Sequence, residues 1–281
     1  MAKIAIVTDS SANLPPEVAQ AHSIYVVPLT LYWEGRAYRD GIDITPAEFY
    51  RRLRTAATLP TTAGPAVGDF LAVYRRLSEQ AEAIVSLHLP PNLSSVFSAA
   101  YLAAQEVKEV PVRVVNCKTA AMGQGFVVLA AARAAQQGAT LEEVVACAEA
   151  VSKRVRVYAT LERLDYLQRS GRVPALASLA SSLLHINPIF CLNGESGASL
   201  VEIPRTRRKA VARLVELMAE QAGDRPVHVA VFQADVPAEA EALRALIAAQ
   251  FRCTELYMTD FTPVMGAHTG PGVLGVAFYT E

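Results

Sequence analysis

The chain has 281 residues, of which 52% are hydrophobic and 19% charged, and its formal net charge at pH 7 is -1. This length exceeds the usual domain size of roughly 100 to 200 residues, so two α/β domains of unequal size are expected. The near-neutral charge argues against a general affinity for nucleic acid or for anionic membranes.

The first half of the chain alternates short β-rich runs with longer helical ones, which is typical of β-α units around a largely parallel sheet. Two helix starts carry a capping box, in which Thr45 pairs with Glu48 and Thr140 with Glu143. Strands are predicted over residues 3–8, 24–31, 83–88 and 112–116, and helices over 49–54, 66–78, 94–107 and 144–153. The stretches 60–65 and 89–93 are then loops that lead into helix N-termini.

The pattern changes near residue 155, where a second domain is expected to begin. Residues 193–197 carry the turn residues of a hairpin, and a run of small residues covers 175–182. Strands are predicted over 155–160, 186–192, 198–203, 227–233, 253–258 and 273–279, and helices over 161–168, 206–221 and 238–250. The expected division is therefore an N-terminal domain over 1–154 and a C-terminal domain over 155–281.

The chain shows no export or membrane signal. Its opening apolar run, residues 4–7, is too short for the core of a signal peptide, and no run approaches the roughly 18 apolar residues of a membrane span. The four cysteines, Cys117, Cys147, Cys191 and Cys253, lie far apart without a Cys-x-x-Cys pair, which fits reduced thiols. We expect a soluble, cytoplasmic protein without disulfides.

Common cofactor and catalytic motifs are absent. There is no Gly-x-x-x-x-Gly-Lys, and Gly123-Gln124-Gly125 lacks the third glycine of a dinucleotide fingerprint. Gly-x-Ser-x-Gly is missing, and the five histidines show no metal-binding spacing. The sequence therefore predicts neither a nucleotide site, nor a metal site, nor any cofactor.

One histidine near the C-terminus is flanked by glycines. Gly266, Gly270 and Gly272 surround His268, so main chain can approach a bound group closely while an imidazole lies beside it. The alternative is a Gly-Pro turn before an edge strand, with His268 at the surface.

Hydroxyl side chains gather before two predicted helices. Thr61 and Thr62 precede the helix at 66, and Ser94 and Ser95 open the next one. Main-chain N–H groups at a helix start lack internal partners, so a hydroxyl beside them makes a small anion site that would suit a carboxylate. The alternative is that Ser94 is an ordinary N-cap and Thr62 an ordinary loop residue.

Five separated segments, in order, resemble the DegV family of fatty-acid-binding proteins. The resemblance covers the whole length of the chain. It places Thr62 at the threonine of a Thr-Ser-x-Pro-Ser loop, Ser94 at the first serine of Leu-Ser-Gly-Thr-Tyr, and His268 in His-x-Gly-Pro-Gly. The segments are Val-Thr-Asp-Ser at 7–10 with Leu-Pro at 14–15, Tyr-Arg-Asp-Gly-Ile-Asp-Ile-Thr at 38–45 with Phe-Tyr at 49–50, Pro-Thr-Thr-Ala-Gly-Pro-Ala at 60–66, Leu-Ser-Ser-Val-Phe-Ser-Ala-Ala at 93–100, and His-Thr-Gly-Pro-Gly at 268–272.

The resemblance implies a two-domain α/β fold with a ligand between the domains. The N-terminal domain would be a three-layer α/β/α structure with a mainly parallel sheet, and the C-terminal domain an α/β structure with a mixed sheet. A long-chain fatty acid such as palmitate would lie in the slot. Its carboxylate would be held by Thr62, Ser94 and His268, with Ser95 and Gly270 beside them.

The resemblance also implies a partner. Family members present the fatty acid to a separate kinase that phosphorylates its carboxyl group for phospholipid synthesis. Arg172 and Arg205 are the best matches for docking that kinase or its phosphate, although a basic run such as residues 205–209 is often only a solvated face.

The chain departs from the family pattern at several positions. Ser95 and Val96 stand where Gly-Thr is usual, Ala63 and Ala66 replace hydroxyls, and residues 116–117 read Asn-Cys where Asp-Ser is common. The expected head-group site is consequently poorer in hydrogen-bond donors.

Two other functions are weaker hypotheses. Ser94 and His268 could serve as nucleophile and base of an acyl-transfer hydrolase, but no acidic residue is placed to orient the histidine. Nucleic-acid binding through residues 205–209 conflicts with the near-neutral charge.

Overall fold

The computed structural model describes residues 3–172, 186–193 and 197–281, and the chain divides into two compact units. The first unit contains Met1–Asp43 and Thr61–Lys153, and the second contains Ile44–Pro60 and Arg154–Glu281. The small-residue run at 175–182 and the hairpin turn at 194–196 lie outside the described residues.

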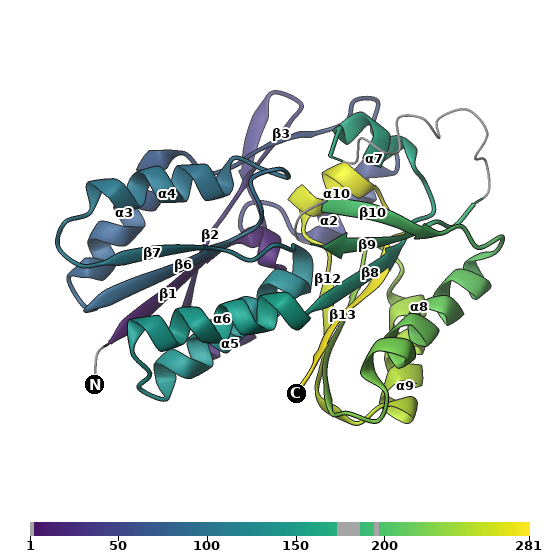
Figure 1. Ribbon diagram of the computed structural model, residues 1–281. Helices are drawn as coiled ribbons and strands as arrows, with labels where there is room; N and C mark the ends of the chain where they lie inside the picture. The colour runs from purple at the N-terminus through teal and green to yellow at the C-terminus, as the bar shows by residue number, and fades with distance from the viewer. Residues whose placement is uncertain (1–2, 173–185, 194–196) are drawn as a thin grey trace. The chain divides into compact units, whose positions relative to one another are not determined.

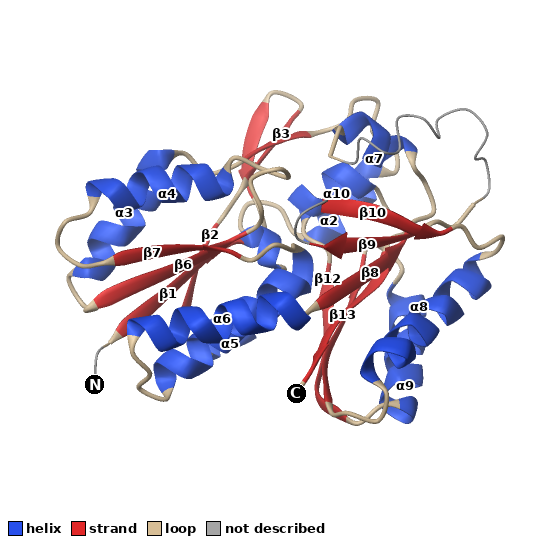
Figure 2. Cartoon of the chain, viewed as in Figure 1, coloured by secondary structure: helices blue, strands red, loops and turns tan. Residues whose placement is uncertain are grey.

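A four-stranded parallel sheet forms the centre of the first unit (Figures 1 and 2). Its strands follow the order β2-β1-β6-β7 and are β1 (Ile4–Asp9), β2 (Ile24–Val27), β6 (Ala83–His88) and β7 (Val112–Asn116). The helices α3 (Val67–Ser78) and α4 (Val96–Glu106) cover one face, and α5 (Ala121–Gln136) and α6 (Leu141–Arg154) lie on the other. The short helices η1 (Ser10–Ala12) and α1 (Pro16–Ala21) connect β1 to β2. The three-layer α/β/α arrangement expected of the N-terminal domain is confirmed.

A second, small antiparallel sheet in this unit corrects two expectations. The strand predicted over 24–31 is divided: β2 ends before Pro28, and β3 (Thr30–Trp33) joins β4 (Arg36–Arg39) and β5 (Thr61–Ala63) in the order β4-β3-β5. Proline lacks the N–H that would continue the ladder, so the chain leaves the parallel sheet there. The stretch 60–65, expected as a loop, contains β5, in which Thr62 pairs with Leu31.

A six-stranded mixed sheet forms the second unit, in the order β10-β9-β8-β13-β11-β12. Its strands are β8 (Arg156–Thr160), β9 (Ile189–Asn193), β10 (Gly197–Glu202), β11 (Val227–Gln233), β12 (Cys253–Asp260) and β13 (Leu274–Thr280), with only β11 and β12 parallel among these pairs. The helices α8 (Arg207–Ala222) and α9 (Pro237–Gln250) pack on this sheet around a buried aliphatic core. The expected mixed sheet is confirmed. Two shorter helices, α7 (Asp165–Ser170) and α10 (Pro263–Thr269), complete this part of the unit.

The segment Ile44–Pro60 belongs to the second unit, which corrects the expectation of a continuous N-terminal domain over 1–154. It carries α2 (Pro46–Leu53), an amphipathic helix whose Phe49, Tyr50 and Leu53 are buried. The Tyr50 hydroxyl donates to the Phe261 carbonyl at 3.0 Å. Apolar burial on one helix face, together with this bond, explains why the chain leaves the first unit and returns to it.

The two predicted capping boxes differ in completeness. At α6 both halves form, because Thr140 N donates to Glu143 Oε2 at 2.8 Å and Glu143 N donates to Thr140 Oγ1 at 3.3 Å. At α2 the Thr45 hydroxyl accepts from Glu48 N at 3.3 Å. Both helices start where the sequence places their caps.

The four cysteines are free thiols, and the helices of the described residues include none that combines the length and apolarity needed to cross a bilayer.

Candidate functional site

The parallel sheet of the first unit contains a switch point between β1 and β6. From β1 the chain continues to β2 on one side, whereas β6 and β7 extend the sheet on the other. Ligands of parallel sheets bind outside the carboxyl ends of the strands at such a point. Here β1 ends at Asp9 and β6 at His88. We therefore expect a site of the first unit at these two strand ends.

Asp9 lies at the switch point with a fully buried side chain. Its Oδ1 accepts from Ser11 N at 3.0 Å and from the Ser11 hydroxyl, and its Oδ2 accepts from Gln124 Nε2 at 3.1 Å. His88 Nδ1 lies 2.7 Å from Oδ2. A buried carboxyl group without partners would cost several kcal/mol in lost hydration. These four contacts offset that cost and join the end of β1 to β6 and α5.

His88 extends this network into the core. Its Nε2 lies 2.7 Å from Ser86 Oγ, and the Tyr74 hydroxyl donates to the same oxygen at 2.8 Å. Burial raises the pKa of Tyr74, which keeps its hydroxyl a donor. Ser86 can then donate to His88 Nε2, and His88 Nδ1–H to Asp9.

Ser86, His88 and Asp9 thus form a serine–histidine–aspartate chain of which every member is 0% exposed. A nucleophile must contact its substrate, so these three buried residues support the strand ends and are not the catalytic residues of an acyl transfer. His88 was not among the predicted site residues, and Asp9 was predicted only as part of a family motif. A histidine and an aspartate that end two buried strands were the available signal.

The start of α4 lies beside the end of β5. A Cβ placed on Gly64 would lie 3.1 Å from Val96 Cγ2 and 3.2 Å from Ser95 Oγ, so these segments approach as closely as a glycine allows. Thr62 is half-buried two residues before Gly64. Ser94 is half-buried as well, and Ser95 is exposed. The first unit therefore brings the segment of Thr62 next to that of Ser94 and Ser95.

Ser94 is not the N-cap of α4. That position belongs to Ser95, which makes no side-chain capping bond. Ser94 Oγ accepts from Val96 N at 3.4 Å, a long hydrogen bond. The weakness of this bond leaves the Ser94 hydroxyl suited to a second, stronger partner.

The Gly123-Gln124-Gly125 segment lies inside α5 and serves packing. Gln124 directs its amide to Asp9, and a Cβ on Gly125 would lie 2.9 Å from the Ala12 carbonyl oxygen. These two contacts give Gln124 and Gly125 packing roles within the first unit.

In the second unit, His268 lies in the last turn of α10. Of the alternative, the turn is confirmed, since residues 271–272 form a turn directly before β13, but the edge strand is wrong. The histidine itself precedes the turn in a helix, residues 263–269, whose first turn contains Pro263, a position where proline is tolerated. The strand that follows, β13, pairs with β8 on one side and β11 on the other, so it is central in its sheet.

Two glycines shape the chain after His268. Gly270 and Gly272 have φ angles of 74° and 88°, which favour glycine. A Cβ on Gly270 would overlap the ring of Tyr166, and one on Gly272 would overlap the carboxyl group of Glu162. The main chain that follows His268 therefore lies directly against the segment of α7.

Burial lowers the pKa of His268 to about 4, and the positive charge of Arg172 contributes in the same direction. The imidazole is consequently neutral at pH 7, with one N–H donor and one acceptor nitrogen. A base with so low a pKa is poorly matched to activating a serine at neutral pH, which argues against the hydrolase hypothesis. An anion placed near His268 and Arg172 would instead meet a donor and a cation.

The predicted basic residues have different surroundings. Arg172 is exposed just after Gly171, the αL residue that ends α7, and donates to the Ser170 carbonyl at 2.6 Å. Arg205 is exposed before α8, whereas Arg207 is bonded to Glu239 at 2.8 Å. The run at 205–209 is therefore not a uniform solvated face.

Metal binding finds no support among the described residues, since none of their histidine, cysteine, aspartate and glutamate side chains form a group of three or more able to hold an ion.

Comparison with known proteins gives matches over nearly the whole chain. A family model described as "Uncharacterised protein, DegV family" matches residues 3–281. A DegV domain-containing protein of Streptomyces coelicolor is 40% identical over 275 residues, which cover 97% of each chain. Protein DegV of Bacillus subtilis is 33% identical over 277 residues, or 98% of each chain.

Two solved structures are similar along their full length. The crystal structure of DegV, a fatty acid binding protein from Bacillus subtilis, has a TM-score of 0.93, 32% identity and complete coverage of both chains. A DegV family protein from Thermus thermophilus, described for its fatty acid binding, also has a TM-score of 0.93, with 31% identity and coverage of 99% of this chain and 100% of its own. The resemblance deduced from the five sequence segments is confirmed.

Proposed function

This chain belongs to the DegV family, and from that membership we propose that it binds a long-chain fatty acid such as palmitate. The observation that carries the proposal is the full-length similarity to the Bacillus subtilis and Thermus thermophilus proteins, both described as fatty acid binding. Similarity at 31–32% identity over whole chains preserves the fold that such a ligand needs.

In this proposal the carboxylate is bound by Thr62 and Ser94, with Ser95 next to them, and by His268 with Gly270. The adjacency of β5 and the start of α4 supports the first group, since two half-buried hydroxyls lie on neighbouring segments. The neutral imidazole of His268 supports the second, because it can donate one N–H to a carboxylate. Each hydrogen bond to a charged group contributes about 1.5 to 3 kcal/mol net.

The acyl chain would supply most of the affinity. Burial of roughly 15 methylene groups at about 0.8 kcal/mol each gives about 12 kcal/mol before ordering costs. The head-group bonds add less and decide which end of the ligand lies at the hydroxyls.

We further propose that the protein has no catalytic activity of its own and presents the fatty acid, in the cytoplasm, to a partner kinase that phosphorylates the carboxyl group for phospholipid synthesis. Arg172 and Arg205 are exposed cations suited to contact the kinase or the transferred phosphate. Arg172 is also the charge that acts on His268, so it lies close to the proposed carboxylate donor.

Mass spectrometry of the denatured protein tests the proposal directly. We expect a co-purified long-chain fatty acid, and saturable binding of palmitate by delipidated protein. The proposal is disproved if the protein carries no bound lipid and no fatty acid binds in the titration.

A further inference from the structure

Strand β7 is an open edge of the parallel sheet. It pairs with β6 on one side, and the described residues place no strand on the other. Cys117 N donates to the His88 carbonyl at 2.8 Å, so main-chain groups of odd-numbered residues point toward β6. By the alternation of a parallel ladder, the N–H and C=O groups of Val112, Val114 and Asn116 point to the open side. These groups can bond to another strand.

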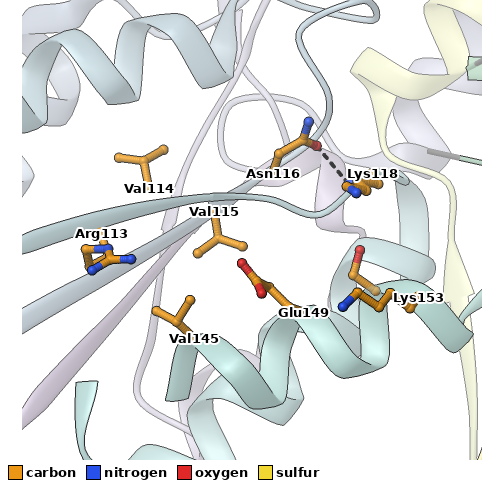
Figure 3. Close-up of a pocket in the computed structure, with 9 residues that line it drawn as sticks. Arg113, Val114, Val115, Asn116, Lys118, Val145, Glu149 and Lys153 are labelled. Atoms are coloured by element: carbon orange, nitrogen blue, oxygen red, sulfur yellow. Dashed lines mark hydrogen bonds between the residues drawn. The ribbon is translucent and has the colours of Figure 1, made fainter. Parts of the chain in front are cut away.

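A cavity of about 380 Å³ lies along this edge, between β7 and α6 (Figure 3). Val115 points from the strand toward Val145 and Glu149 of α6, while Val114 points to the opposite side. Val115 and Val145 are both buried and give the cavity an apolar floor. An open strand edge above an apolar floor is the shape that holds an extended peptide.

Positive charge predominates around this cavity. Arg113 lies at one end, Lys118 and Lys153 lie at the other, and Glu149 is the one carboxylate among the lining residues. Lys118 is fixed at its end of the strand by a bond from its N–H to Asn116 Oδ1 at 2.8 Å. The charges favour an acidic ligand and disfavour pairing of two copies of β7, which would bring these cations together.

We infer that the β7 edge binds an extended acidic segment of a partner protein, which adds to the sheet as a further strand. Main-chain bonds to Val112, Val114 and Asn116 would provide the pairing. Acidic side chains near Arg113 and near Lys118 would provide selectivity, with an uncharged side chain between them opposite Glu149. This surface is independent of the proposed fatty-acid site.

A labelled eight-residue peptide of sequence Val-Glu-Val-Thr-Val-Glu-Val-Thr, whose two glutamates flank an uncharged residue on the same face, is a suitable probe. The same peptide with lysine in place of glutamate is its control. Fluorescence anisotropy should show saturable binding of the acidic peptide alone. Arg113→Glu combined with Lys153→Glu should weaken it by about tenfold or more. The matched control, Arg75→Glu combined with Arg76→Glu, reverses two exposed cations on α3 and should leave binding unchanged.

A second variant tests strand addition itself. Val114→Pro removes one outward N–H and leaves the bonds to β6 in place, so it should weaken peptide binding without loss of the thermal transition. In the parent protein, the peptide should slow amide exchange at Val112, Val114 and Asn116. The inference is overturned by absence of saturable binding, by equal binding of the lysine peptide, by insensitivity to both variants, or by a self-association that Val114→Pro abolishes.

Discussion

The titration of His268 gives the most specific test of the carboxylate site. Burial, and next the charge of Arg172, lower the pKa of His268 to about 4. Relative to an ordinary histidine near 6.5, this difference corresponds to about 3 kcal/mol at 1.36 kcal/mol per pH unit. A carboxylate within hydrogen-bond distance favours the protonated ring, typically by about one to two pH units. A saturating long-chain fatty acid should therefore raise the pKa of His268 by that amount.

The assay is an NMR titration of the histidine rings between pH 4.5 and 8, with the His268 signal assigned by its loss in His268→Gln. Without lipid, the ring should remain neutral over nearly all of this range. Arg172→Gln should raise the pKa of His268 slightly, since it removes the second of the two causes. A lipid-free pKa near 6.5 would refute the burial argument, and a pKa unaffected by bound lipid would remove His268 from the carboxylate site.

The lowered pKa of His268 in the lipid-free protein also affects the free energy of unfolding. Because the pKa of His268 is lower in the folded protein, the unfolded chain binds more protons between about pH 4 and 6.5. The free energy of unfolding should thus decrease as the pH is lowered through this window, by up to about 3 kcal/mol from this group. The decrease should be smaller in His268→Gln.

Three further predictions concern other residues. Thr62→Val or Ser94→Ala should weaken fatty-acid binding by about tenfold or more, as measured by displacement of a fluorescent fatty acid; unchanged affinity in both variants would exclude these hydroxyls from the site. Gly266→Ala should destabilise the second unit by about 3 kcal/mol in thermal denaturation, because the added Cβ would lie 2.8 Å from ring carbons of α2; stability equal to the parent would contradict this packing. His88→Leu should cost about 3 to 5 kcal/mol because it leaves Asp9 with one partner fewer inside the core, whereas His88→Gln, which can still donate, should cost less; equal losses would show that packing alone matters there.

The sequence was most informative where an apolar run had clear ends. The strands β6, β7 and β11 have the predicted bounds, since each is rich in valine and other apolar residues and ends on a polar residue, His88, Asn116 or Gln233. Helix α5 was not identified as an element, because Ala121–Gln136 is buried on nearly all sides and shows no amphipathic period. The division between β2 and β3 was not predicted, because the residues on both sides of Pro28 favour strands and were read as one strand.

The residues of the candidate site could likewise be predicted only in part. Thr62, Ser94 and His268 could be selected because they lie in short local motifs. The bond between His88 and Asp9 could not, because it joins residues that are 79 positions apart in the chain. The helical state of His268 was also hidden, since two glycines within five residues predict a turn until the close packing of Gly266 on Phe49 is known.

The path of residues 44–60 has a consequence for biosynthesis. Helix α2 leaves the ribosome early, yet the carbonyl that Tyr50 bonds, that of Phe261, is 211 residues further along the chain. The ion pair of Arg54 with Asp235 spans 181 residues. Until those residues emerge, Phe49 and Tyr50 present an uncovered apolar face on a helix too short to be stable alone. The second unit therefore cannot complete its fold before Phe261 has been synthesised, and a fragment beginning at Arg154 would lack a part of its own core.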